Sequence, residues 1–262
     1  MSNIRKKDLG PFLRSLESRY NRCFLDADPV FFVHRYQDPG DQEVVGFISS
    51  LLAFGHVKSI HVSVQKVLQV LGSHPYLFLS SFDPTGWKKA CKTLGHRWVR
   101  GEDLFLLFVV LHKILHRYSS LKACFLEGYA SVDPDLGKMM DLFSKKVFSL
   151  VASEKLSRGF RYFFPSPQGG SPCKRFNMFL RWMVRPADGI DLGLWPEIPA
   201  SKLTIPLDTH IYSFARRFRL SRYKNPNWKL ACDVTKFLKT LEPQDPVKFD
   251  FSICHYGMEV GW

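Results

Sequence analysis

The sequence predicts an all-α protein. Apolar residues recur at the spacing of amphipathic helices along most of the chain, and Asn or Asp residues stand where several of these runs begin. No alternating apolar and polar run of any length indicates a strand. The chain has 262 residues, of which 45% are hydrophobic. It can therefore bury a core, as one large domain or as two small lobes.

The first helices are predicted from periodicity near the N-terminus. Residues 9–22 place apolar side chains on one helical face. Residues 42–54 form a strongly apolar helix that breaks at Gly55, and residues 57–71 resume as a helix that ends at Gly72. We expect a helix, a short polar turn and a second helix in this region.

The middle of the chain combines a connection with a buried helix. Residues 74–103 are rich in turn formers and basic residues, and we expect one short helix among them. Residues 103–118 are apolar almost all round, with Asp103 as the expected N-cap, which predicts a buried helix. One more helix is expected at 136–151, and residues 153–163 lead into the turn PSPQGG.

Chemistry is concentrated between Gly169 and Arg219. A Gly-containing hairpin delivers Lys174 to the start of an apolar-faced helix, and the segment TIPLDTHIYSFARRF places Asp208 at the start of another. Two further helices follow, each after a capping residue: 227–241 with Asn227 and 245–258 with Asp245.

The chain is strongly basic. Lys and Arg outnumber Asp and Glu by 37 to 24, and the formal charge is +13, which favours nucleic acid or an anionic membrane as partner. There is no uncharged apolar run of about 18 residues and no signal-peptide pattern at the start, so we expect no membrane span and a cytoplasmic location. Six scattered cysteines lack metal-ligand spacing, so we expect no metal or cofactor.

Residues 204–218, TIPLDTHIYSFARRF, resemble the segment that carries the essential aspartate in helix-hairpin-helix DNA glycosylases. Upstream, PSPQGGSPCKRFNMFL is similar to the hairpin and lysine-bearing helix of that family, and 42–71 to its N-terminal helix pair. The resemblance implies a single two-lobed helical unit over 1–262 with a cleft between the lobes. The implied lobes are 35–165 and 1–34 plus 166–262.

The sequence also departs from the family pattern. The usual hairpin is Leu-Pro-Gly-x-Gly-x-Lys, whereas Gly169-Gly170 is followed here by Ser-Pro-Cys before Lys174. The spacing from Lys174 to Asp208 is closest to the archaeal 8-oxoguanine glycosylase branch, and the four-cysteine cluster of endonuclease III-like members is absent from this sequence. An uncharacterised bacterial group within the superfamily is the other placement.

Lys174 and Asp208 are the implied catalytic pair. A lysine amine can attack the anomeric carbon of a damaged nucleotide and form a Schiff base, and a carboxylate can stabilise the oxocarbenium-like centre as the base departs. The alternatives are a surface lysine that contacts phosphate and an ordinary aspartate N-cap. The two roles of Asp208 are compatible, because one oxygen can cap while the other faces the sugar.

Contacts with the DNA backbone are expected from the hairpin, from the basic stretch 216–239 and from the turn after Gly55, where the family inserts a wedge beside a flipped base. The expected DNA-binding residues are Gly169, Gly170, Ser171, Arg175, His56, Lys58 and Arg216. A plain turn, a helix corner and a solvated basic face are the structural alternatives. Arg181 and Arg185, on the lysine helix, can likewise be interpreted as DNA contacts or as part of a solvated face.

A flipped base needs aromatic side chains to stack on and polar groups to read its edge. The candidates are Trp195, Phe251, His255 and Asp188. Core packing is the alternative for the aromatic residues, and turn formation is the alternative for Asp188.

The sequence thus favours a monomeric DNA-repair N-glycosylase with AP-lyase activity, acting on double-stranded DNA with an oxidised base such as 8-oxoguanine, in the bacterial nucleoid. A non-enzymatic helix-hairpin-helix DNA-binding protein is the alternative. An all-α protein that meets an anionic membrane or acidic proteins is a third class.

Overall fold

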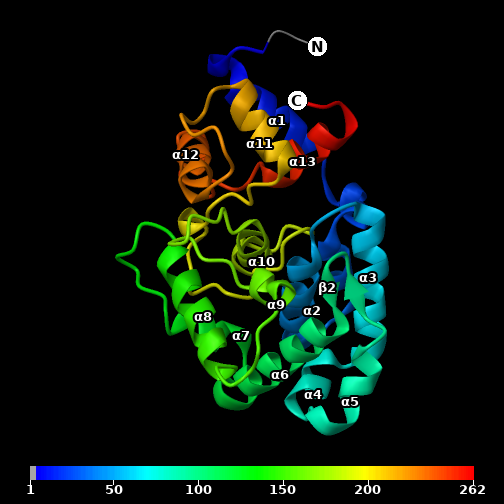
Figure 1. Cartoon of the computed structure of the whole chain (residues 1–262). Coiled ribbons are helices and arrows are strands. Elements are labelled where there is room, and N and C mark those ends of the chain that lie inside the picture. Colours follow the sequence, from blue (N-terminus) through cyan, green and yellow to red (C-terminus); the bar gives the residue numbers. More distant parts are fainter. Residues whose placement is uncertain (1–3) are drawn as a thin grey trace. The chain divides into compact units, whose positions relative to one another are not determined.

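The structure, a computed structural model, describes residues 4–262 (Figure 1). The described chain is helical apart from one two-stranded antiparallel sheet, so the predicted all-α class is confirmed. It divides into two compact units. The terminal unit comprises the described residues up to Asp26, with Pro134–Leu136 and Pro167–Trp262, and the central unit comprises Ala27–Asp133 and Gly137–Ser166.

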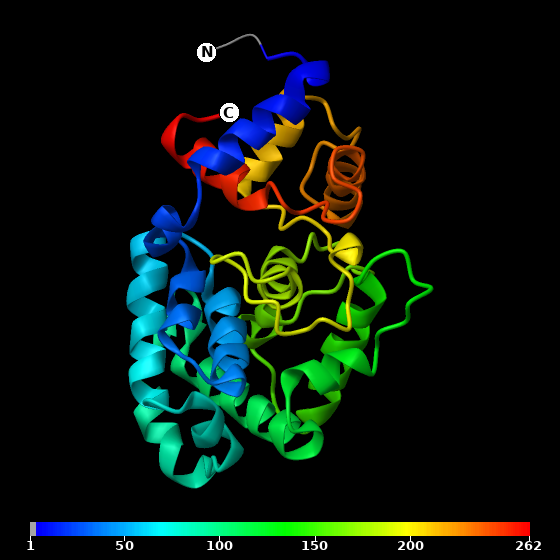
Figure 2. The same ribbon diagram turned by 180° about the vertical axis from the view of Figure 1, so that it is seen from behind.

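In the terminal unit, α13 (Asp250–Glu259) packs against α1 (Leu9–Arg19) and α11 (Thr209–Arg217) (Figure 2). Phe214 of α11 is fully buried, and its ring lies 5.0 Å from the ring of Trp262, which follows α13. The remaining elements are η1 (Lys6–Asp8), η2 (Arg22–Ala27, which runs to the unit boundary), α10 (Lys174–Val184), η4 (Ala200–Lys202) and α12 (Trp228–Lys239).

The central unit is built around α6 (Gly101–Tyr118), the long apolar helix that the sequence predicts to be buried. It contacts α4, α5, α7, α8 and α9. The elements of this unit are η3 (Pro29–Arg35), α2 (Pro39–Leu52), α3 (Val57–Leu71), α4 (Pro75–Ser80), α5 (Pro84–Cys91), β1 (Gly95–His96), β2 (Val99–Arg100), α7 (Leu121–Leu126), α8 (Gly137–Leu150) and α9 (Arg158–Phe163).

Several predicted helix ends are confirmed because local chemistry sets them. Asp208 caps α11 by accepting from the Ile211 N–H at 2.7 Å, and Asn227 caps α12 by accepting from Leu230 N–H at 2.8 Å. α3 stops at Gly72, whose φ of 74° lies in the region that glycine occupies without strain.

Other predicted elements are wrong in detail. Residues 74–103 contain two short helices and the β1–β2 hairpin, instead of one helix, because Pro75 and Pro84 each start a helix. α6 begins at Gly101, and Asp103 sits one turn inside, where its carboxylate accepts from the Arg100 N–H at 2.8 Å. Within 153–163, which the sequence predicts only as the lead into a turn, residues Arg158–Phe163 form α9.

Two further differences come from tertiary contacts. The helix α7 (Leu121–Leu126) was not expected; its first N–H groups donate to the buried carboxylate of Glu43 on α2. Asp245 does not cap the last helix, which begins at Asp250, because its carboxylate pairs with Arg185 at 2.9 Å.

Gly101 marks the closest backbone approach in the central unit. A β-carbon added there would overlap the backbone carbonyl of Cys91, at the end of α5, whereas one added at Gly86 within α5 would meet nothing within 4 Å. Packing of α5 on α6 therefore requires glycine at 101 and not at 86.

Gly101→Ala should lower the free energy of unfolding by about 2 kcal/mol or more, because the obstructing carbonyl is backbone and cannot rotate away. Gly86→Ala should raise it by about 0.5–1 kcal/mol by removing glycine from an open helical position. Urea unfolding of both variants measures the difference, and equal stability of the two would contradict the packing argument.

Candidate functional site

Asp208 is held firmly at the start of α11. It is half-buried and follows a buried extended segment that ends at Leu207. Its Oδ1 accepts from the Ile211 N–H, and its Oδ2 accepts a hydrogen bond from the Cys254 thiol at 3.0 Å. A thiol is a weak donor, so Oδ2 keeps most of its capacity to interact with a cation.

Cys254 is a site residue that the sequence did not indicate. It lies on α13 and meets Asp208 across 46 residues of chain. Nothing local distinguishes it from the other five cysteines. The contact arises because α13 packs against α11.

Lys174 is the first residue of α10 and is half-buried. The preceding Cys173 adopts a left-handed conformation, with φ 48° and ψ 36°, and its N–H donates to the Ser171 hydroxyl at 3.2 Å. Asn177 donates to the Pro172 carbonyl at 3.1 Å. These contacts set the register of the hairpin, so that α10 begins at Lys174.

The hairpin before Lys174 is exposed at Gly169 and Gly170. Gly170 has φ 83°, and nothing would lie within 4 Å of a β-carbon there, so another molecule can approach closely. Its N–H donates to the Pro167 carbonyl at 2.9 Å and its carbonyl accepts from Trp228 N–H at 3.2 Å. The N–H of Gly170 is therefore used within the turn and not directed at a phosphate.

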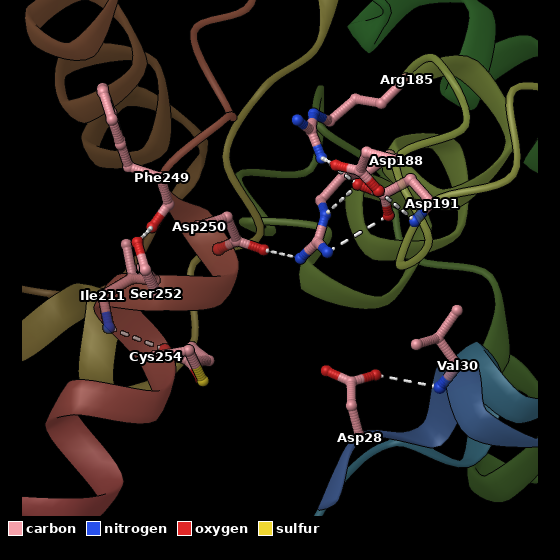
Figure 3. Close-up of polar contacts among 12 residues, drawn as sticks. Asp28, Val30, Arg185, Asp188, Asp191, Ile211, Phe249, Asp250, Ser252 and Cys254 are labelled. Carbon is pink, nitrogen blue, oxygen red and sulfur yellow. Dashed lines mark hydrogen bonds and ion pairs between the residues drawn. The ribbon is translucent and has the colours of Figure 1, made fainter. Parts of the chain in front are cut away.

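Two arginines of the same helix form a buried ion-pair network (Figure 3). Arg181 pairs with Asp250 at 2.6 Å and with Asp191 at 3.2 Å, and the side chains of Arg181 and Asp191 are 2% and 0% exposed. Their interpretation as a solvated face or as DNA contacts is wrong, because both arginines lie inside the unit.

Arg185 extends the network with contacts to Asp191, to Asp188 at 2.9 Å and to Asp245 at 2.9 Å. Although burial acts in the other direction, the charges of Asp191 and Asp245 raise the pKa of Arg185. Burial likewise opposes ionisation of Asp188, but hydrogen bonds from the Asp191 and Ile190 N–H groups, with the charge of Arg185, lower its pKa.

The network links the two candidate helices through α13. Asp250 and Cys254 are four residues apart on α13 and so lie on neighbouring turns of one face. Asp250 pairs with Arg181 of the Lys174 helix, and Cys254 donates to Asp208 of α11. α13 therefore connects the helix that begins with Lys174 to the residue that caps α11.

The candidates for a base pocket comprise three buried rings and the exposed Asp188. Trp195 is 0% exposed and packs edge-to-face on Phe179 at 5.3 Å. Phe251 and His255 are 4% exposed, with their rings 4.1 Å apart. Asp188 accepts from two backbone N–H groups of its own turn. These contacts agree with the structural alternatives, core packing for the aromatic residues and turn formation for Asp188, and the base-reading role stays a prediction.

The predicted DNA contacts divide by exposure. Arg216 is exposed in the last turn of α11, together with the other basic residues of 216–239, whereas Arg175 is only 6% exposed and is not available to a phosphate. His56 and Lys58 are exposed in the central unit, where the His56 ring accepts from the Lys58 N–H and caps α3.

A buried charge that loses its partner destabilises a protein by about 3–5 kcal/mol. Arg181→Met, which leaves Asp191 and Asp250 without that guanidinium, should therefore lower the free energy of unfolding by this amount. Arg216→Met at an exposed position should change it by less than about 0.5 kcal/mol. Urea unfolding measures both, and a small effect for Arg181→Met would show that the network does not hold the helices.

Comparison with known proteins yields one family. The family described as "Protein of unknown function (DUF2400)" matches residues 28–259. No curated protein and no solved structure matches the chain. No helix within residues 4–262 is long and apolar enough to cross a membrane, and no group of three or more His, Cys, Asp or Glu residues in that range could hold a metal ion. Because the match covers most of its length, the chain belongs to the DUF2400 family.

Proposed function

We propose that this protein is a DNA N-glycosylase with AP-lyase activity, acting on duplex DNA that contains an oxidised base such as 8-oxoguanine. The observation that carries the proposal is the state of Asp208. One carboxylate oxygen caps α11 while the other is restrained only by a weak thiol donor. The carboxylate is thus held in place and remains able to stabilise a cationic centre.

Lys174 supplies the nucleophile. Its neutral amine forms a bond to C1′ of the damaged nucleotide, the C1′–N bond breaks, and the base leaves with the electron pair and takes up a proton. The lysine nitrogen loses a proton and the C1′–O4′ bond opens, which gives the Schiff base. Loss of a C2′ proton then expels the 3′ phosphate by β-elimination.

Asp208 acts before the Schiff base forms. As the C1′–N bond lengthens, positive charge develops on C1′ and O4′, and a fixed carboxylate stabilises that charge without reorganising. The cap matters here, because the Ile211 N–H holds the carboxylate in one orientation.

The proposed DNA contacts come from exposed features of the terminal unit. The hairpin at Gly169 and Gly170 allows close approach of a DNA backbone, and Arg216 belongs to a basic stretch whose arginines and lysines are all exposed. These contacts position the duplex and do not read its sequence. In a bacterial cell such a protein works at the nucleoid.

The proposal predicts a covalent complex when the protein, an oxidised-purine duplex and borohydride are mixed, because hydride reduces the Schiff base to a stable amine. Lys174→Ala should abolish trapping. Asp208→Asn should lower base release by about 10²-fold while stability stays near wild type, since Asn caps helices as well as Asp. Lys202→Ala, at another half-buried lysine of the terminal unit, is the matched control.

A wild-type protein that traps on none of a panel of oxidised, deaminated and abasic duplexes would remove the enzymatic proposal. So would a Lys174→Ala variant that traps as well as the wild type.

A non-enzymatic helix-hairpin-helix DNA-binding protein is the second candidate. The burial of Trp195, Phe251 and His255 favours it, because these side chains offer no stacking surface to a flipped base. Such a protein would bind DNA as well with Asn at 208 as with Asp, and it would release no base.

Both candidates predict that duplex binding weakens steeply with salt. Arg216→Ala should reduce the slope of log affinity against log salt concentration by about 0.9, the value for one lost phosphate contact. Arg14→Ala is the control, because Arg14 is exposed on α1 but pairs with Glu242 at 3.2 Å. Fluorescence anisotropy of a labelled duplex at several salt concentrations measures both slopes. Equal slopes for wild type and Arg216→Ala would exclude Arg216 from the interface.

A further inference from the structure

The central unit exposes two aromatic side chains that lie in contact with each other. Across residues 4–262, Trp98 and Tyr162 are the only Phe, Trp or Tyr residues with large exposed fractions, 45% and 38%. They lie 64 positions apart in the sequence, yet their ring centroids are 5.2 Å apart. Two exposed aromatic rings in contact therefore form one surface.

A third ring completes this surface. Phe54, at the end of α2, is half-buried, and its ring lies 5.0 Å from that of Trp98 and 5.0 Å from that of Tyr162. We call Phe54, Trp98 and Tyr162 the aromatic platform. It joins residues of the turn after α2, the β1–β2 hairpin and α9. In the same unit β1 contacts α3, and β2 contacts α9.

Buried polar contacts hold the platform in place from two sides. The His96 Nε2 donates to the Phe54 carbonyl at 2.6 Å, and its Nδ1 lies 2.9 Å from the Ser63 hydroxyl of α3. Asp103 accepts from the Arg100 N–H at the end of β2 and from the Ser157 hydroxyl that caps α9. The three rings are therefore presented by fixed backbone and not by a loose loop.

The chain that leads into and through the β1–β2 hairpin is basic. The stretch 88–100 contains Lys88, Lys89, Lys92, Arg97 and Arg100 and no acidic residue, and all five cations are exposed. The Arg97 guanidinium lies 4.8 Å from the centre of the Trp98 ring. The Arg97 side chain also lies against Gly55, where its Cδ is the atom nearest to the position of an added β-carbon. A cation that stacks on the platform is thus placed beside the turn that carries His56.

We propose that the aromatic platform binds an unpaired base of single-stranded DNA, with Arg97 and Arg100 on the adjoining phosphates. Aromatic faces accept any base and a basic rim attracts the backbone, which is the combination that single-strand binding needs. Paired bases stack within the duplex and leave no face free for these rings. The proposal rests on the DNA-binding half of the proposed function and not on its chemistry.

The chemistry of the platform favours this occupant over a protein segment. An apolar protein partner would gain from the rings but would have to cover Arg97 and Arg100 of the same hairpin, and leaving such charges unpaired at an interface costs affinity. A nucleotide satisfies both features at once, because its base stacks and its phosphate is anionic.

The test is anisotropy with a labelled 12-nucleotide oligothymidylate and with a fully paired duplex of the same length. Trp98→Ala and Tyr162→Ala should each weaken single-strand binding by about 5- to 150-fold, the equivalent of ~1–3 kcal/mol per stacked base. Duplex binding should change less than twofold. Trp98→Phe should retain most of the single-strand affinity, and Arg97→Ala should reduce the salt slope by about 0.7.

Leu77→Ala is the matched control, because Leu77 is a 62% exposed apolar residue on α4 of the same unit. Single-strand affinity that is unchanged in both Trp98→Ala and Tyr162→Ala, with wild-type melting curves, would overturn the proposal. So would a wild-type protein that does not bind the oligonucleotide at low salt.

The outcomes also separate this proposal from the enzymatic one. Asp208→Asn should bind the oligonucleotide like wild type. Loss of trapping on every lesion duplex with intact, Trp98-dependent single-strand binding would remove the glycosylase and leave the platform. Lysine-dependent trapping with single-strand binding that does not depend on Trp98 would keep the glycosylase and remove the platform.

Discussion

The contact of Arg181 with Asp191 and Asp250 is the interaction on which the terminal unit depends. Both partners of the Arg181–Asp191 pair are almost fully excluded from solvent, with 2% and 0% of their side chains exposed. Removing charges from water costs free energy, and the attraction between paired charges offsets this desolvation cost only when every charge keeps its partner. The network therefore couples α10 to α13 in one arrangement and strongly disfavours others that separate a charge from its counterion.

That coupling determines what Asp208 can do. α13 carries Asp250 toward the lysine helix and Cys254 toward the aspartate, so a displacement of α13 would change both. The cap on α11 fixes one carboxylate oxygen through a short-range backbone contact, whereas the environment of the other depends on a tertiary contact. The hydrogen bonding of the Asp208 carboxylate is thus set in part by the packing of α13 against α11.

The two units present different surfaces to a polyanion. In the terminal unit, a glycine hairpin allows close approach, and the exposed arginines and lysines of 216–239 supply positive charge. None of the described Phe, Trp or Tyr side chains of this unit is as exposed as Trp98 or Tyr162. In the central unit, the aromatic platform combines exposed rings with a cation-rich stretch. Phosphate contacts suit paired DNA, whereas stacking requires a base that has left its pair.

The sequence by itself determined the all-α class, the helices α3, α11 and α12 and the caps at Asp208 and Asn227, because periodicity and capping act within a few residues of chain. It also singled out Lys174 as a helix start. It misplaced Asp103 and Asp245 as helix caps and did not indicate that Arg181 is buried. The tertiary structure decided the surroundings of Asp245, Arg181 and Asp208, because their partners Arg185, Asp250 and Cys254 lie 60, 69 and 46 residues away. An arginine in a basic chain looks like a surface cation until the fold surrounds it with carboxylates, and burial has no signature in local spacing.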